Sequence, residues 1–330
     1  MIDQYDREIN YLRVSVTDRC NLRCTYCMPK QGISQIGHDD ILRYEEILRI
    51  CRIATGEGIT KVRLTGGEPL TRRGLAEFVA SLRTIPELKD ISLTTNGILL
   101  EAHAEQLFAA GIRRINISLD SLNAEKYARI TRGGDIHAVL RGIRKVREVG
   151  FAPIKINIVA ISGFNDDEIL DFARLTLANP YQIRFIELMP LGTAGAENDG
   201  RYLPNSVIRQ RIETLGPLEA LNGGRGKTEG PARIYRLPGG AGEIGFISPV
   251  SRHFCHSCNR LRLTAEGHLR ACLLSDDETD LKGPLRAGRS DGEIGALIRE
   301  VIARKPKRHE IACDEDHIKK CVKEMPAIGG

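Results

Sequence analysis

Short apolar runs alternate with longer stretches of helical periodicity through the first 190 residues. The runs are rich in Ile, Val and Leu and have the length of buried strands, whereas the segments between them repeat their apolar residues at the period of a helix. The pattern predicts strands over 12–16, 61–65, 91–95, 114–119, 154–160 and 183–188. It predicts helices over 44–56, 73–83, 101–109, 136–149 and 166–177.

Alternating strands and helices imply a parallel sheet that helices cover. The six predicted strands are fewer than the eight of a complete barrel, so a doubly wound open sheet and a partial barrel both satisfy the pattern. In either fold, ligands bind at the carboxyl ends of the strands. The residues expected at those ends are 18–27, 66–68, 96–97, 120–121 and 187–190.

The alternation stops after Met189. Residues 191–205 are rich in Gly, Asn and Ala and predict a loop. Beyond it we expect short strands over 233–237, 243–248 and 261–264 and a helix over 292–303. The chain therefore divides into an α/β region over 1–190 and a smaller α+β region over 191–330.

Composition places the chain among ordinary globular proteins, with 330 residues, 42% hydrophobic and 28% charged. No stretch approaches the roughly 20 apolar residues of a membrane span. The first six residues hold two acids and no apolar core, unlike a secretory signal. A net charge of +5 does not by itself argue for nucleic acid, and it fits a small acidic substrate. We expect a cytoplasmic protein that binds neither membranes nor nucleic acid.

Six of the nine cysteines fall into two groups, which in a reduced compartment is typical of metal ligands. Cys20, Cys24 and Cys27 have the spacing C-x3-C-x2-C. Three thiolates can hold three irons of a [4Fe–4S] cluster and leave the fourth iron open to a ligand. A structural zinc site usually needs four ligands, and neither a histidine nor a fourth cysteine stands beside this loop.

The second group is Cys255, Cys258 and Cys272, with the spacing C-x2-C-x13-C. It also offers three thiolates. A neighbouring histidine (His253, His256 or His268) would complete a Cys3His zinc site. The spacing alone favours zinc and iron–sulfur about equally.

The first cysteine loop resembles the cluster motif of the radical S-adenosylmethionine superfamily, including an aromatic residue, Tyr26, before the third cysteine. The segment Thr65-Gly66-Gly67-Glu68-Pro69, after the second predicted strand, resembles the superfamily's second motif. The resemblance implies a partial (β/α)6 barrel and a turn at 66–69 that cradles the methionine end of S-adenosylmethionine. It also implies reductive cleavage of S-adenosylmethionine, which starts radical chemistry on a substrate.

Over nearly its whole length, the chain is similar to the family of GTP cyclases that act in molybdenum cofactor biosynthesis. The segments that carry this resemblance are 18–24, 63–70, 93–97, 114–120, 184–189, 258–262 and the terminal Gly-Gly. The resemblance implies two [4Fe–4S] clusters, the second of which binds the purine of GTP. It implies attack at the ribose C3′ and closure onto C8 of guanine. It also implies a homodimer whose product passes to a cyclic pyranopterin monophosphate synthase; the electron donor is left open.

Individual positions follow from the same resemblance. The positions that match S-adenosylmethionine contacts are Tyr26, Gly67, Ser118 and Met189. The positions that match GTP contacts are Arg13, Arg63, Thr94, Lys155, Arg184, Arg260, Leu261 and Arg262. Gly329 and Gly330 match a tail that enters the active site and is needed for cyclisation. Independently of the resemblance, guanidinium groups bind phosphate oxygens in pairs, and alternation puts Arg260 and Arg262 on one face of a strand.

Two other functions fit parts of the sequence. A radical enzyme that modifies peptides usually carries more C-terminal cysteines than the three seen here. The second alternative is a non-catalytic iron–sulfur or zinc protein that binds nucleotide or RNA. In such a protein the 66–69 turn would have no function. Three cysteines followed by Arg260 and Arg262 favour a nucleotide substrate.

Overall fold

In a computed structural model of the chain, all strands join one sheet. The strands are β1 (Tyr11–Ser15), β2 (Lys61–Thr65), β3 (Asp90–Thr95), β4 (Arg114–Ser118), β5 (Ile154–Ala160), β6 (Tyr181–Glu187), β7 (Glu219–Ala220), β8 (Arg233–Arg236), β9 (Glu243–Ile247), β10 (Arg260–Leu263), β11 (His268–Arg270) and β12 (Thr279–Asp280). Their order is β12-β11-β10-β1-β2-β3-β4-β5-β6-β9-β8-β7. The structure describes residues 1–192, 200–221, 230–309, 321 and 323–329.

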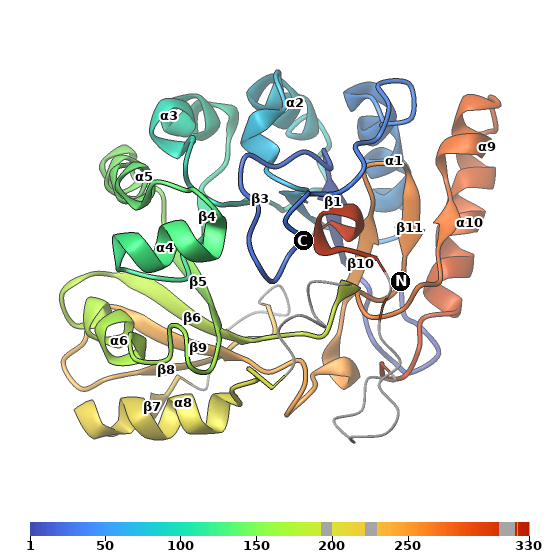
Figure 1. Ribbon diagram of the computed structural model, residues 1–330. Coiled ribbons are helices and arrows are strands. Elements are labelled where there is room, and N and C mark those ends of the chain that lie inside the picture. The colour runs from blue at the N-terminus through green and yellow to red at the C-terminus, as the bar shows by residue number, and fades with distance from the viewer. Residues whose placement is uncertain (193–199, 222–229, 310–320, 322, 330) are drawn as a thin grey trace.

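Helices cover the outer side of the curved sheet, as Figure 1 shows. They are α1 (Tyr44–Gly56), α2 (Leu75–Leu82), α3 (Leu100–Ala110), α4 (Ala124–Thr131), α5 (Ile136–Val149), α6 (Ile169–Ala178), α8 (Asn205–Ile212), α9 (Lys282–Arg286) and α10 (Asp291–Ala303). Single turns of 3-10 helix are η1 (Pro69–Thr71), η2 (Glu213–Leu215), η3 (Cys255–Ser257) and η4 (Met325–Ile328). None of these described helices is both long and apolar enough to cross a membrane.

Strands β1 to β6 pair in parallel, each with the next along the chain, which confirms the predicted partial barrel. Two strands of the C-terminal region extend this sheet in the same direction, β10 beside β1 and β9 beside β6. One sheet therefore crosses the predicted boundary near residue 190, and the division into two regions stays a prediction.

Register explains why three arginines meet. Arg13 of β1 lies opposite Arg262 of β10 and opposite Arg63 of β2. Residues in register on neighbouring strands point to the same face of a sheet. The three side chains therefore share the interior face, although they come from segments about 50 and 200 residues apart in the chain.

Helix α6 begins at Ile169, three residues later than predicted. The reason is Asn165, whose amide group is engaged elsewhere. Its Nδ2 donates to the carbonyls of Asp120 and Val159, at 2.7 and 2.9 Å, and its Oδ1 accepts from the N–H of Ile161 at 2.8 Å. Asn165 therefore ties the end of β5 to the loop after β4 instead of capping a helix.

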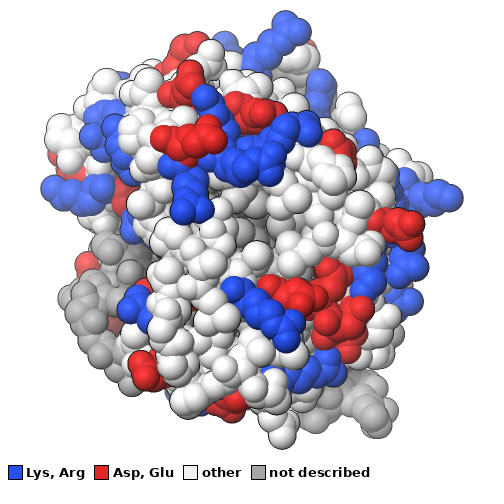
Figure 2. All heavy atoms as spheres, turned by 90° about the vertical axis from the view of Figure 1, so that its left-hand side faces the viewer, with Lys and Arg blue, Asp and Glu red and all other residues white. Residues whose placement is uncertain are grey.

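Charges of both signs alternate on the face formed by α3 to α6 (Figure 2). Arg141 pairs with Glu101 at 2.9 Å, and Lys126 pairs with Asp167 at 2.6 Å. Arg141 and Lys126 on this face therefore lie beside carboxylates that compensate their charges.

Candidate active site

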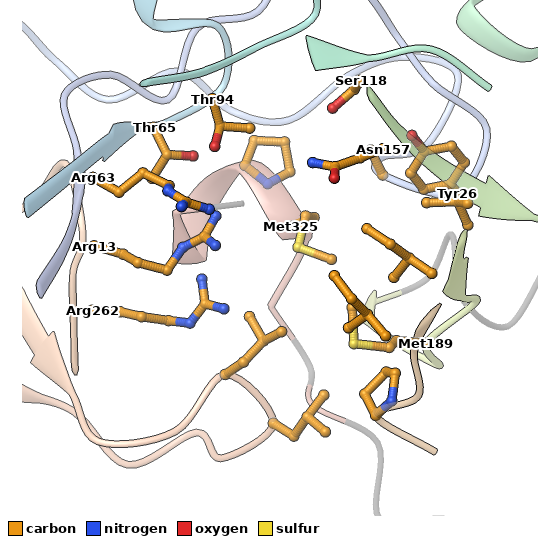
Figure 3. Close-up of a pocket in the computed structure, with 18 of the residues that line it drawn as sticks. Arg13, Tyr26, Arg63, Thr65, Thr94, Ser118, Asn157, Met189, Arg262 and Met325 are labelled. Carbon is orange, nitrogen blue, oxygen red and sulfur yellow. The ribbon is translucent and has the colours of Figure 1, made fainter. Parts of the chain in front are cut away.

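One cavity of about 310 Å³ lies at the carboxyl ends of the barrel strands and is lined by both cysteine groups. Most of the predicted contact residues line it as well. These are Arg13, Tyr26, Arg63, Gly67, Thr94, Ser118, Arg184, Met189, Arg260 and Arg262. Figure 3 shows that Arg13, Arg63 and Arg262 converge on one side, whereas Tyr26, Ser118 and Met189 lie on the opposite side. The cavity thus has a cationic half and a half next to the first cysteine loop.

The first cysteine loop is held against the end of α4. The N–H groups of Arg23 and Thr25 donate to the carbonyls of Thr131 and Ile130, at 3.0 and 2.9 Å. Arg132 ends the helix with a left-handed backbone, φ 56°, and its guanidinium donates to carbonyls of the loop at both Arg23 and Met28. An unpredicted helix therefore shapes the loop.

The donor set of this loop suits an iron–sulfur cluster. Cys20, Cys24 and Cys27 are free thiols that border one cavity. Burial raises the pKa of each, and for Cys24 and Cys27 the neighbouring thiols and Asp120 raise it further. Three thiolates in one partly buried loop are stable together only beside a strong positive charge, and iron supplies it.

Gly66 and Gly67 bring the 66–69 turn close to the backbone that leads into this loop. A Cβ on Gly67 would lie 2.3 Å from the carbonyl oxygen of Arg19, and one on Gly66 would lie 2.4 Å from that of Thr17. The N–H of Gly67 donates to Thr17 at 2.7 Å, and that of Glu68 donates to Arg19 at 2.7 Å. These glycines therefore allow the turn to approach the backbone that immediately precedes Cys20.

Glu68 ties the turn to the end of β3. Its carboxylate accepts from the hydroxyl of Thr95 at 2.7 Å, from the N–H of Asn96 at 2.6 Å and from the N–H of Leu70 at 3.0 Å. Burial raises its pKa to about 7, against the effect of these hydrogen bonds. An ammonium bound in the cavity would favour the ionised form.

Asp120 and Asn157 also line the cavity and were not among the predicted contact residues. Asp120 follows β4, accepts from the hydroxyl of Tyr26 at 2.7 Å and accepts from the N–H of Val159 at 2.8 Å. Burial raises the pKa of Asp120 to about 6. The position of Asp120 at the end of a predicted strand could have indicated that it lines the site. Asn157 lies inside β5, and no sequence pattern indicated it.

In the second group, burial raises the pKa of Cys258, but Arg260 and Lys305 outweigh burial and bring the pKa down to about 6. The guanidinium carbon of Arg260 also lies 4.9 Å from the centroid of the Phe254 ring. Of the candidate histidines, His253 lines the cavity, whereas His256 and His268 do not. The described residues contain no three His, Cys, Asp or Glu side chains placed to hold a single metal ion.

The arginines form a cationic surface, in which Arg262 is buried and Arg13 is half-buried. Burial lowers the pKa of Arg13 to about 10, and the charges of Arg63 and Arg260 act in the same direction. Burial lowers the pKa of Arg262, and repulsion from the charges of Arg13 and Arg260 lowers it as well. Clustered cations that repel one another are stabilised by a bound polyanion.

Lys155 does not line this cavity. It lies on β5 two positions before Asn157, so it points to the same face nearer the start of the strand. There it lines a second cavity of about 290 Å³ together with Arg114 and Gln182. Burial, together with repulsion from Arg184 and Arg63, lowers the pKa of Lys155 to about 6. Leu261 is a core residue that is 1% exposed.

The C-terminal segment reaches the cavity. Met325 and Pro326 of η4 line it, and Met325 lies between the two halves in Figure 3. The carbonyl of Gly329 accepts from Nη1 of Arg262 at 3.1 Å. Gly330 lies outside the described residues.

Replacing Gly67 by Ala is expected to displace the cysteine loop, because the new Cβ would stand 2.3 Å from a backbone oxygen. We expect a loss of bound iron and of S-adenosylmethionine binding, measured by iron analysis and calorimetry under anaerobic conditions. Gly56→Ala is the control, since a Cβ there meets no atom within 4 Å. It is expected to be neutral or to stabilise by up to about 1 kcal/mol. Normal iron and cofactor binding in Gly67→Ala would show that the contact is relieved without cost.

Comparison with known proteins agrees with this geometry. The Radical SAM superfamily model matches residues 14–176, and the Molybdenum Cofactor Synthesis C model matches 181–311. The chain has the fold of the SuiB protein of Streptococcus suis, solved with S-adenosylmethionine, with a TM-score of 0.58 and 14% identity over 93% of this chain and 73% of that one. The likeness to SuiB shows the fold alone, and the Radical SAM match together with the relatives described next makes the chain a radical S-adenosylmethionine protein.

Closer relatives narrow the class. The GTP 3′,8-cyclase of Moorella thermoacetica is 53% identical over 94% of this chain and 95% of its own. The GTP 3′,8-cyclase of Alkaliphilus metalliredigens is 47% identical over 100% of both chains. The chain belongs to the GTP 3′,8-cyclase family.

Proposed function

We propose that the chain converts GTP to (8S)-3′,8-cyclo-7,8-dihydroguanosine 5′-triphosphate, an early step of molybdenum cofactor biosynthesis. The observation that carries this proposal is one cavity that joins two cysteine triplets to buried and half-buried arginines from β1, β2, β6 and β10. The likeness to SuiB, at 14% identity, bears on the fold alone. A triphosphate matches the charge and the paired N–H groups of this arginine cluster, which a peptide substrate does not need.

In this proposal each group of three cysteines holds one cluster. Cys20, Cys24 and Cys27 hold the first [4Fe–4S] cluster, which when bound supplies the electron for cleavage of S-adenosylmethionine. Cys255, Cys258 and Cys272 hold the second cluster beside the purine. Three thiols in each group leave one iron of each cluster open to a ligand.

The protein's own side chains orient the two small molecules. Ser118, Met189 and the Asp120-bound Tyr26 border the space next to the first cysteine loop, where S-adenosylmethionine is proposed to lie. On the opposite side, Arg13, Arg63 and Arg262 bind phosphate oxygens through paired N–H groups. Arg184 and Thr94 line the cavity between β3 and β6. In this proposal the ribose lies between the cofactor and the phosphates.

The test is anaerobic turnover. The protein is reconstituted with iron and sulfide, supplied with S-adenosylmethionine, dithionite and GTP, and the products are identified by mass spectrometry. We expect 5′-deoxyadenosine together with a cyclised guanosine triphosphate. Formation of 5′-deoxyadenosine with unchanged GTP would contradict the substrate assignment. Formation of neither product, with both clusters present, would favour a non-catalytic nucleotide-binding protein.

We further propose that Lys155 binds the far end of the triphosphate and that its protonation makes GTP affinity depend on pH. In the protein without ligand its pKa is about 6, so the amine is mostly neutral at pH 8. A bound polyanion raises that pKa, so binding takes up a proton at pH values above about 6. GTP affinity should fall as pH rises through this window, by up to about tenfold per unit.

Calorimetry between pH 6 and 9, in two buffers of different ionisation enthalpy, measures this proton uptake. The control is Lys155→Met, which removes the lysine's share of the pH dependence and isolates the titration of GTP itself. Identical pH profiles for the two proteins would remove Lys155 from the site.

The oligomeric state, the location in the cell and the enzyme that consumes the product belong to the same proposal. We infer a homodimer in the cytoplasm, where thiols stay reduced. We infer that its product is consumed by a cyclic pyranopterin monophosphate synthase. Light scattering and a coupled assay with that synthase test the two inferences separately.

A further inference from the structure

The segment that follows α10, residues 305–307, contacts every stretch of chain that carries the second cysteine group. Lys305 is only 2% exposed. Its Nζ donates to the carbonyl of Arg260 at 2.8 Å and to the carbonyl of Ala271. Arg260 stands two residues after Cys258, and Ala271 immediately precedes Cys272. One buried ammonium therefore joins two cysteine-bearing stretches that are distant in the sequence.

Arg7 connects the remaining cysteine to the same segment. It is 5% exposed, and its guanidinium donates to the carbonyl of Cys255 at 2.9 Å and to that of Pro306 at 2.9 Å. Asp3 pairs with Arg7 at 2.6 Å and holds the guanidinium in place. The positions of all three cysteines are thus fixed relative to residues 305–307.

The charge of Lys305 has no carboxylate partner among the described residues; its hydrogen bonds go to the two carbonyls. Burying an unpaired ammonium is costly. Burial lowers the pKa of Lys305, and the thiolates of Cys258 and Cys272 act in the opposite direction and favour its charged form. In turn, Lys305 is one of the cations that favour the thiolate of Cys258. The lysine and the cysteines compensate one another electrostatically.

We propose that Lys305 is a positioning residue for the second cluster. It holds the Cys258 and Cys272 stretches at the spacing that a cluster needs, and its charge offsets the negative charge of the cluster and its thiolates. A positive charge beside a cluster favours its reduced form, so Lys305 also raises the reduction potential of this cluster relative to a neutral residue.

The test replaces Lys305 by Met, which keeps the length and apolar stem of the side chain and removes the ammonium. Iron and sulfide are measured per chain before and after a fixed chelator challenge. Removal of such a supporting group weakens metal binding by about 10- to 100-fold, so we expect the challenged variant to lose about half of its iron. The first cluster should persist, seen as an electron paramagnetic resonance signal that changes on addition of S-adenosylmethionine.

Lys307→Met is the matched control. It removes the same charge two residues further along the chain, from a side chain that is exposed. It is expected to keep all its iron. Lys305→Arg keeps charge and donors and is expected to retain more iron than the Met variant. In any second cluster that Lys305→Met retains, the midpoint potential should be lower than in the wild type.

Wild-type iron retention and midpoint potential in Lys305→Met would overturn the proposal. Loss of both clusters together would also overturn it, since Lys305 would then support the whole fold. The inference rests on the proposed second cluster. A wild-type protein that holds only one cluster would contradict the proposed function itself, which distinguishes the two failures.

Discussion

Replacing Cys24 by Ala is expected to abolish formation of 5′-deoxyadenosine. Cys24 lies between Cys20 and Cys27 in the loop that borders the cavity, and it is half-buried. Without it the loop offers two thiolates, too few for a cluster held by three. We expect loss of about half of the bound iron and no detectable cleavage of S-adenosylmethionine. Anaerobic iron analysis and chromatography of the nucleosides measure both effects.

Cys51→Ala is the matched control. Cys51 is also a free cysteine, but it belongs to α1 and is buried in the apolar core. Its replacement is expected to cost about 1 kcal/mol of stability and to leave cofactor cleavage unchanged. Full cleavage by Cys24→Ala would show that the first cysteine group is not the reacting centre.

Deleting Gly329 and Gly330 is expected to abolish cyclisation and to leave both clusters in place. The carbonyl of Gly329 accepts from Arg262, and η4 before it lines the cavity. The tail therefore contacts the cationic half of the site without contributing a cysteine. Cleavage of S-adenosylmethionine should continue uncoupled, because the first cysteine loop is untouched.

A milder change separates the tail's conformation from its presence. Gly329 has φ +79°, and a Cβ there would lie 3.2 Å from the Cβ of Ser15. Gly329→Ala is therefore expected to reduce cyclisation less than the deletion does. Product yield per 5′-deoxyadenosine is the measurement for both variants. An unchanged yield in the truncated protein would assign the tail no part in the reaction.

Local patterns predicted the barrel well. Strands at 61–65 and 154–160 and helices at 44–56 and 136–149 have the predicted bounds. Helix α4 was missed because it buries only Tyr127, Ile130 and Thr131, whereas α2, which is equally short and was predicted, buries four apolar residues. Helix α8 was missed because it follows directly on a stretch whose composition predicted a loop.

The site was only partly predictable. The cysteines and the 66–69 turn are visible as motifs, since their spacing is local. The meeting of Arg13 with Arg262 depends on β10 pairing with β1, a contact between segments 249 residues apart that no local pattern encodes. The support that Arg7 and Lys305 give to the second cysteine group is equally non-local. Lys155 was predicted at the GTP site but lies in a second cavity, and its role stays a proposal.

The central claim is that one cavity brings a radical formed from S-adenosylmethionine to the ribose of GTP. Turnover of GTP carrying deuterium at C3′ tests it most directly. The account predicts that 5′-deoxyadenosine gains one deuterium and that the cyclised product loses it. Unlabelled 5′-deoxyadenosine, formed beside GTP that keeps its deuterium, would contradict the account.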